Sequence, residues 1–396
     1  VYEGIYLPTR GRPIDAIGQG LDIIRHRIGE KLHVLGVAVT GSGRHLAAHL
    51  LGADLVKNEI TCQMRGAVEI APDVDTIFEI GGQDSKYIHV REGRIEDFVM
   101  NKICAAGTGS FLEEQADHLG VAIVDEFSRL AATSAAPSDL GCQCTVFMHS
   151  EVVAAQRRGT STPDLCAGLA CSVAHNYLDR VVSGRPVGRS IMFQGGVANN
   201  PSVVAAFQQI LGTPVRVHPY AKVSGASGAA LLMREARRTT TSFRGLDACR
   251  DREVTSFECE ACANRCQVNQ ILVERHKVYF GDACERYSSR VVGHPENDVP
   301  DLIARWQEIE QYYMVPPPEP RGRIGILRAS TLLDQLPFWT PFFARLGYEV
   351  VPSQPSSQAT LQAGLRRLPA ETCLPIKLAF GHVQELVEAG VDHIFL

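Results

Sequence analysis

Four cysteines in the second half of the chain have the spacing of a metal site. The segment FECEACANRCQV (257–268) arranges Cys259, Cys262 and Cys266 as C-x2-C-x3-C, and Cys284 follows in YFGDACERY (279–287). Four thiolates can hold either an iron–sulfur cluster or a structural Zn²⁺ ion, and the spacing does not separate the two. Metal-free thiols are the third interpretation.

A second group of residues has the form of a phosphate-binding turn. EIGGQDSK (79–86) places Gly81 and Gly82 directly after a strand-like run, where backbone N–H groups can approach a polyphosphate. Gln83 and Asp84 can position water or hydrated Mg²⁺, so they are the catalytic candidates. Lys86 is either a phosphate ligand or a partner in a structural ion pair. By itself the string also fits an ordinary turn that enters a hairpin.

Two later turns have the same order of strand, glycine and helix. They are FQGGVANN (193–200) and GASGAA (225–230). Together they could accommodate an adenosine against flat glycine backbone, with a helix N-terminus near the phosphates. Close helix packing is the alternative for GASGAA. The candidate binding residues in these turns are Gly195, Gly196, Asn199, Gly225 and Gly228.

Hydrophobic periodicity and turn residues predict the elements that must position these turns. A hairpin is expected where KYIHV (86–90) and RIEDFVM (94–100) flank Glu92-Gly93. Asn200-Pro201 predicts a helix start. The other expected strands are 34–40, 76–80 and 190–194, and the other expected helices are 109–120, 145–159 and 223–238.

Composition excludes several classes of protein. The chain has 396 residues, is 45% hydrophobic and carries a formal net charge of -5 without runs of Lys or Arg, so neither nucleic acid nor an anionic membrane surface is an expected partner. No apolar run approaches the roughly 20 residues of a membrane span. Twelve cysteines without a leader sequence favour metal or redox chemistry in a reducing compartment. A cytoplasmic location is expected.

The ordered strings EIGGQDSK, MNKICAAGTGSFLEEQA (100–116), CTVFMHSEV (144–152), FQGGVANN and SGASGAA resemble a known family. It comprises activators of 2-hydroxyacyl-CoA dehydratases and ATPase subunits of benzoyl-CoA reductases. The resemblance implies an α/β fold of the actin/hexokinase (ribonuclease H-like) ATPase type that binds ATP and Mg²⁺. It also adds Gly107 and Gly109 to the candidate nucleotide-binding residues.

The same resemblance implies an electron-transfer function. Coupled to ATP hydrolysis, one electron would pass from a [4Fe-4S] cluster to a CoA-thioester dehydratase or reductase, or to a related double-cluster reductase. Ferredoxin or flavodoxin would be the electron source. The cluster would be shared within a homodimer, or between two modules of one chain.

The cysteines that match the cluster ligands of the family are Cys104 and Cys144. Each precedes a predicted helix, whose N-terminus favours a thiolate. Two cysteines cannot complete a cluster that takes four thiolates, but two subunits can supply two each. Cys142 lies two residues from Cys144, and we favour Cys144 because the string CTVF carries the resemblance.

The chain departs from the family pattern in three places. Ser42 replaces a tyrosine in TGSGR (40–44), and CQMRGA (62–67) lacks a histidine that this stretch often carries. The first phosphate loop, an Asp-x-Gly-Ser-Thr string, is not in the chain and is expected before Val1, since both ends look cut. We therefore expect weak or absent ATP binding by this fragment alone.

Four segments are expected along the chain: the ATPase domain (1–238), a polar linker (239–255), a cysteine-rich segment (256–314) and a partial α/β domain (315–396). The last two resemble the region that follows the activator modules in long fused activator-like proteins, and more distantly the dehydratase-type partner subunits. By that resemblance Cys373 is a ligand, and a core thiol is the alternative. GILRAS, GYEVVPS, a helix and DHIFL predict the beginning of a parallel sheet.

Two other functions compete with the activator interpretation. A small-molecule kinase of the same fold would need an Asp base in a substrate cleft and would not use Cys104 and Cys144. A metal-stabilised scaffold with a degenerate ATPase half is the non-enzymatic alternative. His149, His175 and His218 are interpreted as surface or hydrogen-bonded core residues.

Overall fold

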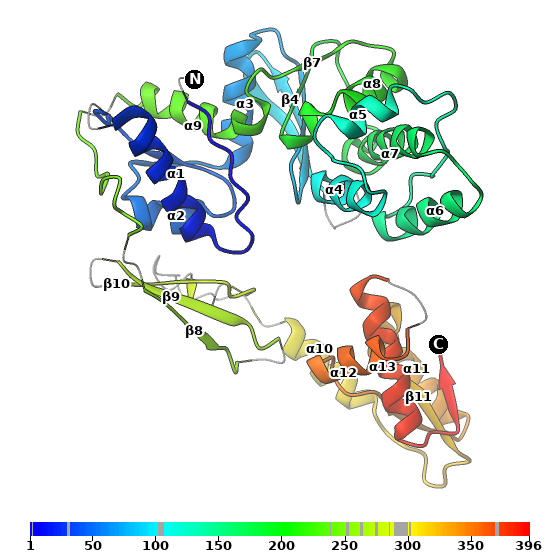
Figure 1. Cartoon of the computed structure of the whole chain (residues 1–396). Helices are drawn as coiled ribbons and strands as arrows, with labels where there is room; N and C mark the ends of the chain where they lie inside the picture. The colour runs from blue at the N-terminus through cyan, green and yellow to red at the C-terminus, as the bar shows by residue number, and fades with distance from the viewer. Residues whose placement is uncertain are drawn as a thin grey trace. The chain divides into compact units, whose positions relative to one another are not determined.

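The structure is a computed structural model that divides the chain into two compact units, Val1–Arg252 and Glu253–Leu396 (Figure 1). Each unit is described by itself. The residues that the structure describes are 1, 3–29, 32–101, 107–237, 239–250, 253–261, 264–273, 276–284, 286–288, 300, 302–368 and 372–396. In those ranges no helix has both the length and the apolar character needed to cross a membrane.

A five-stranded sheet forms the centre of the first unit, in the order β5-β4-β3-β6-β7. β3, β4 and β5 pair antiparallel, whereas β3, β6 and β7 pair parallel. The hairpin and the two strands predicted from sequence around the glycine turns are therefore confirmed. The bounds are β3 Thr76–Ile80, β4 Ser85–Arg91, β5 Arg94–Met100, β6 Ile191–Gln194 and β7 Val215–Val217.

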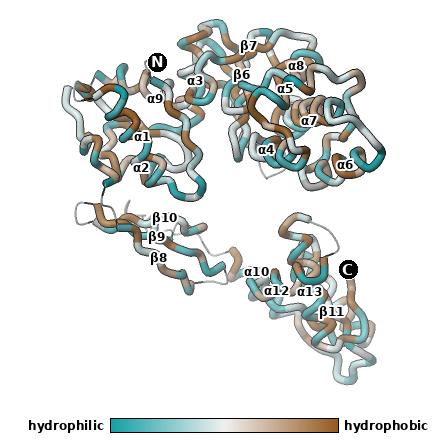
Figure 2. The backbone as a smooth tube through the Cα atoms, viewed as in Figure 1, coloured by the Kyte–Doolittle hydropathy of each residue, from teal (hydrophilic) through white to brown (hydrophobic). Residues whose placement is uncertain are grey.

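The central strands are buried on both faces, which explains their nearly continuous apolar sequence. All five residues of β3 and all four of β6 are buried, whereas β5 at the edge is mostly exposed. Hydrophobic stretches accordingly gather in β6 and in α7 (Thr162–Tyr177) (Figure 2). Phe78 and Phe193 of the sheet meet Tyr177 and Phe207 in edge-on or tilted ring contacts with centroids 5.1 to 5.5 Å apart.

Helices predicted from sequence flank this sheet. α8 (Pro201–Leu211) begins as expected, because the Asn200 side chain accepts a hydrogen bond from the backbone N–H of Ser202. α4 (Gly109–His118) and α6 (Thr145–Arg157) confirm the two helices that follow the cysteine strings. The short α5 (Glu126–Ala131) lies between them in the chain.

The rest of the first unit contains α1 (Pro13–Ile28), α2 (Arg44–Leu51), α3 (Glu59–Ile70) and α9 (Ser224–Glu235). The strand expected over 34–40 is limited to β1 (Ala38–Val39), which pairs parallel with β2 (Leu55–Val56). One cause is that the backbone N–H of Val37 donates to the Asp54 carboxylate at 2.8 Å instead of to a neighbouring strand.

In the second unit, β8 (Val254–Glu258), β9 (Gln267–Val273) and β10 (His276–Phe280) form an antiparallel sheet in the order β10-β9-β8. A parallel sheet follows in the order β12-β11-β13, as the sequence predicts. Its strands are β11 Arg323–Ile326, β12 Glu349–Pro352 and β13 His393–Phe395.

The helices of the second unit are α10 (Leu302–Tyr313), α11 (Ser330–Arg345), α12 (Gln358–Leu365) and α13 (Leu374–Glu388). No helix is expected from the sequence over α11. Pro337 and Pro341 lie inside that helix, where proline normally breaks the hydrogen-bond ladder. Leu336 is nevertheless fully buried in a cluster with Ile324 and Ile326 of β11, so burial of one apolar face outweighs the local preference.

Candidate functional site

The turn between β3 and β4 rests against the start of α4. Within the turn, the backbone N–H of Gly81 donates to the carbonyl of Asp84 at 2.9 Å. From α4, the N–H groups of Gly109 and Ser110 donate to the carbonyls of Gly81 and Gly82, also at 2.9 Å. The turn that the sequence predicts to bind phosphate is thus hydrogen-bonded to the helix that follows Cys104.

Two glycines near the start of α4 lie in tight contacts that favour the absence of a side chain. A Cβ atom on Gly109 would lie 3.0 Å from the Gly81 carbonyl oxygen. Gly107 has a φ of +67° and its Cβ would lie 3.0 Å from Cγ2 of Val173. Both glycines permit a close approach between neighbouring segments that a side chain would hinder.

The second glycine turn contacts the first. Gly195 follows β6 with a φ of +89°, and a Cβ atom there would lie 2.3 Å from the carbonyl oxygen of Ile80 and 2.9 Å from Oε1 of Glu79. Gly196 has open space beside it, and the exposed Asn199 donates from Nδ2 to its carbonyl at 3.3 Å. The structure therefore brings the turns at 81–84 and 195–196 together at the ends of adjacent parallel strands.

A buried ionic cluster lies beneath these turns. Lys86 is only 3% exposed, and its Nζ lies 2.8 Å from Oδ1 of Asp84, 2.9 Å from Oε2 of Glu79 and 3.6 Å from Oε1 of Glu59. Gln83 is exposed, and the Asp84 side chain is 43% exposed. Of the two roles that the sequence offers for Lys86, the ion pair is the one that matches these contacts.

Burial and neighbouring charges shift the pKa values of Glu79 and Lys86 in opposite directions. Burial raises the pKa of the Glu79 carboxyl to about 7, although the charge of Lys86 opposes the shift. For Lys86, burial alone would lower the pKa, but the charge of Glu79 and hydrogen bonds to Asp84 and Glu79 outweigh it and hold the pKa above its usual value. Lys86 therefore stays protonated and remains a donor to Asp84 and Glu79.

The third glycine group opens α9 and is linked to the second turn through α3. Gln63 of α3 accepts at Oε1 from Nε2 of Gln194 and from Oγ of Ser224, both at 2.8 Å. A Cβ atom on Gly225 would lie 3.3 Å from Nε2 of Gln63. At Gly228 a Cβ atom would lie 1.8 Å from the carbonyl oxygen of Cys62, so close helix packing accounts for that glycine.

Several polar residues of this site are not predicted from the sequence. These residues are buried or contact residues of other elements, which no single stretch of sequence reveals: Glu59, Gln63, Glu79, Gln194 and Ser224. One signal is present in the sequence. Glu59 and Gln63 stand four residues apart, and residues with that spacing share a face if the segment is helical.

Cys144 occupies the N-cap position of α6 and is half-buried, whereas Cys142 is exposed. Its expected partner, Cys104, lies outside the described residues. Two cysteines per chain would need a second subunit or module, so a site of this kind is not completed by one copy. Within the described ranges, no group of three or more His, Cys, Asp or Glu residues could hold a metal ion.

α4 and α6, which follow the two cysteines, contact each other side by side (Figure 1). The rings of His118 and His149 meet edge-on with centroids 4.9 Å apart. Nδ1 of His149 lies 3.0 Å from Oε1 of Gln115, and Nε2 of His118 lies 3.2 Å from Oε1 of Gln156. A shift of one helix would therefore displace the side chains of the other.

Cys259, Cys266 and Cys284 lie on segments that leave the same end of the sheet β8-β9-β10. Glu258, before Cys259, pairs with Gln267, after Cys266, and Phe280 at the end of β10 pairs with Asn269. The backbone N–H of Ala261 donates to Sγ of Cys259 at 3.5 Å, and Nδ2 of Asn264 donates to Sγ of Cys266 at 3.2 Å. Cys284 is exposed. Cys262 lies outside the described residues.

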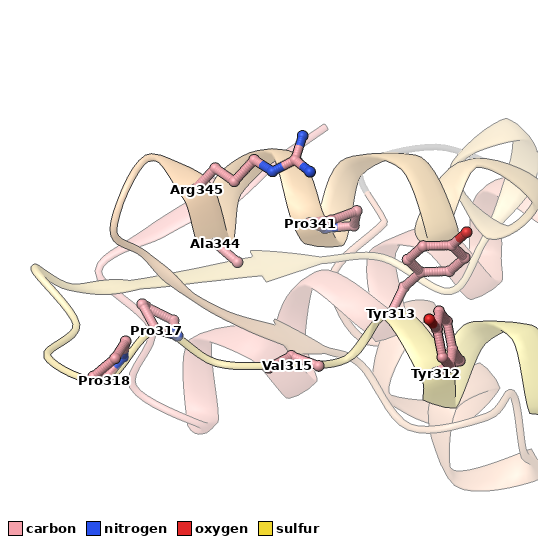
Figure 3. Close-up of a pocket in the computed structure, with 8 residues that line it drawn as sticks. All are labelled: Tyr312, Tyr313, Val315, Pro317, Pro318, Pro341, Ala344 and Arg345. Atoms are coloured by element: carbon pink, nitrogen blue, oxygen red, sulfur yellow. The ribbon is translucent and has the colours of Figure 1, made fainter.

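The second unit has two further features of interest. Cys373 is half-buried at the N-cap of α13, before Leu374-Pro375. A pocket lies between the end of α10, the proline-rich segment and α11, and Figure 3 shows the side chains around it. Its lining is mostly apolar and aromatic: Tyr312, Tyr313, Val315, Pro317, Pro318, Pro341, Ala344 and Arg345.

Comparison with known families gives two matches along the chain. Residues 5–233 match the model described as the BadF/BadG/BcrA/BcrD ATPase family. Residues 323–396 match the CoA enzyme activase uncharacterised domain. The sheet β8-β9-β10 with its cysteines lies between the two matched regions.

Characterised relatives match the first unit. The (R)-2-hydroxyglutaryl-CoA dehydratase activating ATPase of Acidaminococcus fermentans is 38% identical over 192 residues, which are 48% of this chain and 72% of the relative. The activator of lactoyl-CoA dehydratase of Anaerotignum propionicum is 37% identical over 198 residues, which are 50% of this chain and 74% of the relative.

Two solved structures are similar in fold. One is the activator of the 2-hydroxyisocaproyl-CoA dehydratase from Clostridium difficile with bound ADPNP, with a TM-score of 0.52 and 33% identity over 56% of this chain and 81% of that one. The other is component A of the (R)-2-hydroxyglutaryl-CoA dehydratase of Acidaminococcus fermentans, with a TM-score of 0.53 and 34% identity over 59% and 88% of the two chains. The expected fold of the first unit is thereby confirmed.

Proposed function

The chain belongs to the BadF/BadG/BcrA/BcrD ATPase family, and from this premise we propose that it is an ATP-dependent reductive activator of a CoA-ester dehydratase or reductase. The observation that carries the proposal is the contact between the two glycine turns and the helix after Cys104. Gly81 and Gly82 accept hydrogen bonds from α4, and Gly195 touches the end of β3. A nucleotide bound at these turns would therefore act directly on α4.

Nucleotide binding rests on backbone groups and on Asp84. Gly81, Gly82, Gly195 and Gly196 would admit the polyphosphate, and Asp84, with Gln83, would position Mg²⁺ or the attacking water. The wider set proposed to contact the nucleotide comprises Gly107, Gly109, Asn199 and Gly225, whereas Gly228 of the expected set packs against α3. Hydrolysis at such a site depends on positioning and charge stabilisation more than on covalent chemistry by the protein.

The electron would come from a cluster held by Cys104 and Cys144 of each of two subunits, or of two modules in one chain. When bound, a [4Fe-4S] cluster supplies one-electron transfer at a potential tuned by its surroundings. Cys144 at the start of α6 is suited to the role, because a helix N-terminus stabilises a thiolate. Ferredoxin or flavodoxin is the proposed source, and a dehydratase or reductase component the proposed acceptor.

Coupling between the two sites follows from the contacts of α4. Its first N–H groups bind the β3–β4 turn, and its later residues contact α6 through the pair His118 and His149. Nucleotide state would thus change the relative position of two helices that each follow a proposed cluster ligand in the chain. A ligand can drive such a change only if it binds one arrangement more tightly.

The test compares Cys144→Ser with Cys142→Ser in the full-length protein, prepared and reconstituted without oxygen. We expect the first variant to lose the iron and sulfide of the shared cluster, its EPR signal and ATP-coupled electron transfer. Cys142→Ser should retain all three, since it is exposed and lies outside the proposed ligand set. ATP-coupled reduction that persists after Cys104 and Cys144 are both replaced by serine would contradict the proposal.

We also propose that Cys259, Cys262, Cys266 and Cys284 bind a second metal, either Zn²⁺ or an iron–sulfur cluster. Support comes from the common sheet end from which their loops leave, and from the N–H groups that donate to two of the sulfur atoms. Metal analysis of Cys259→Ser should show the loss of this metal, with Cys249→Ser as the control. Loss of zinc alone, or of iron with sulfide, identifies the occupant.

A further inference from the structure

Lys86 is surrounded by carboxylates and directs its donors into the protein. Its ammonium group lies 2.8 Å from Asp84, 2.9 Å from Glu79 and 3.6 Å from Glu59. An ammonium has three N–H donors and no acceptor. Asp84 and Glu79 accept two of these donors, Glu59 lies at ion-pair distance, and only 3% of the Lys86 side chain is exposed, so the ammonium faces carboxylates and not an open phosphate site.

The three carboxylates come from three elements that meet at the nucleotide turns. Glu79 lies opposite Lys86 in the β3–β4 pairing, so the two side chains project from the same face of the hairpin. Glu59 is the first residue of α3. Asp84 belongs to the turn itself and is the most exposed of the three side chains.

The second oxygen of Glu79 also lies beside the turns. An ideal Cβ on Gly81 would be 3.5 Å from Oε1 of Glu79, and one on Gly195 would be 2.9 Å from the same atom. Lys86 holds Glu79 through the other oxygen, Oε2, at 2.9 Å. The ammonium therefore fixes both the carboxylate of the turn and the carboxylate packed beneath the two glycine turns.

We propose that Lys86 is a positioning residue that fixes the Asp84 carboxylate for Mg²⁺, and that it does not bind phosphate itself. The inference rests on the proposed function, because it assumes a Mg²⁺-nucleotide at the turn. Lys86 occupies Oδ1 of Asp84 and leaves Oδ2 as the oxygen for the hydrated ion. Mg²⁺ demands close to ideal octahedral geometry, so a carboxylate held in one orientation binds it better than a mobile one.

The experiment measures binding of ADPNP to the full-length protein by calorimetry over a series of Mg²⁺ concentrations. For Lys86→Met we expect the Mg²⁺ concentration needed for half-maximal binding to rise about tenfold, the factor that corresponds to about 1.4 kcal/mol. Binding of ADPNP in the presence of EDTA should change less than about twofold, because no phosphate contact is lost.

Lys86→Met leaves three carboxylates without their cation and can fail to fold, since an unpaired buried charge is costly. The double variant Glu79→Leu/Lys86→Met removes both members of the buried pair and should recover thermal stability. It still lacks the cation that holds Asp84, so the shift in Mg²⁺ dependence should remain. Arg91→Met is the matched control, because this residue lies on the same strand in an exposed ion pair with Glu96.

Two results would overturn the inference. An unchanged Mg²⁺ dependence in the double variant would reduce Lys86 to a structural role. An equal loss of ADPNP affinity with Mg²⁺ and with EDTA would mean that Lys86 contacts phosphate. Failure of the nucleotide binding on which the proposed function rests is distinguishable from both, since the unmodified protein and Arg91→Met would then bind no ADPNP under any condition.

Discussion

At the scale of single residues, Asp164 is a carboxylate held by several hydrogen bonds away from the nucleotide turns. It accepts from Oγ of Ser134 and Oγ of Ser161 at 2.6 Å each, and from the N–H of Ala136 at 3.1 Å. These bonds, that from Ser134 first, lower its pKa from 3.8 to about 2. The ionised form is therefore favoured in the folded state.

A depressed pKa predicts a definite dependence of stability on pH. The stabilisation is present above the pKa of the unfolded chain and is lost as the pH falls through the folded value, that is between about pH 4 and about pH 2. We expect Asp164→Asn to lower the free energy of unfolding near neutral pH. The free energy of unfolding should then fall less steeply as the pH is lowered. Urea denaturation at several pH values measures both.

Asp139→Asn is the control for this prediction, because Asp139 is exposed and accepts a backbone hydrogen bond from Gly141 at the ordinary distance of 2.9 Å. Its free energy of unfolding near neutral pH should stay closer to that of the unmodified chain than that of Asp164→Asn does. An Asp164→Asn profile that parallels the unmodified one throughout would show that Asp164 carries no linked proton.

Residues whose role depends on local chain geometry can be identified from the sequence. Cys144 lies at a helix start and Gly81 at the end of a buried strand, as the strings predict. Glu79 is missed, because TIFEI has the pattern of an ordinary buried strand. Only the pairing register, which sets Glu79 opposite Lys86, reveals that this strand carries a buried charge.

At the scale of elements, α3 and α9 cross with almost no space between their backbones. A Cβ atom on Gly228 would lie 1.8 Å from the carbonyl oxygen of Cys62 and 3.0 Å from the backbone nitrogen of Gly66. Because both neighbours are backbone atoms, a side chain here must force the helices apart. Overpacking of this kind typically costs about 1–3 kcal/mol.

We therefore expect Gly228→Ala to lower the free energy of unfolding by at least about 2 kcal/mol in urea denaturation. Gly43→Ala is the comparison, since nothing in the described part of the chain lies within 4 Å of its Cβ position. Its free energy of unfolding should stay within about 0.5 kcal/mol of the unmodified chain. Equal effects of the two substitutions would contradict the packing explanation.

The elements that the sequence predicts are those in which local preference and burial agree. β3, β6 and α8 have apolar runs, glycine turns or a capping Asn at their ends. α11 is missed because Pro337 and Pro341 argue against a helix, while tertiary packing of Leu336 and its neighbours maintains one. The opposite happens at β1, which is shorter than its apolar run because a side chain takes the hydrogen bond of Val37.

At the scale of the whole molecule, each compact unit has its own hydrophobic core. Phe207 is fully buried in the core of the first unit, and Leu336 is fully buried in that of the second. Phe→Ala and Leu→Ala changes in cores typically cost about 2–5 kcal/mol. We expect Phe207→Ala to lower the temperature of one calorimetric transition and Leu336→Ala that of another.

The two variants are controls for each other, because each leaves the other core intact. A single transition that moves as a whole in both variants would mean that the two units unfold together. In that case one free energy of unfolding describes the chain, whereas separate transitions require one for each unit.

The place of β3 in its sheet has a consequence for how the protein is made. β4 and β5 follow β3 directly and pair on one side, but its other neighbour, β6, begins only at Ile191. While the ribosome adds the intervening residues, one edge of a strand that is fully buried in the finished fold has no partner. Open strand edges recruit strands from other chains. Until β6 has been synthesised, this edge of β3 is therefore one through which incomplete chains could associate.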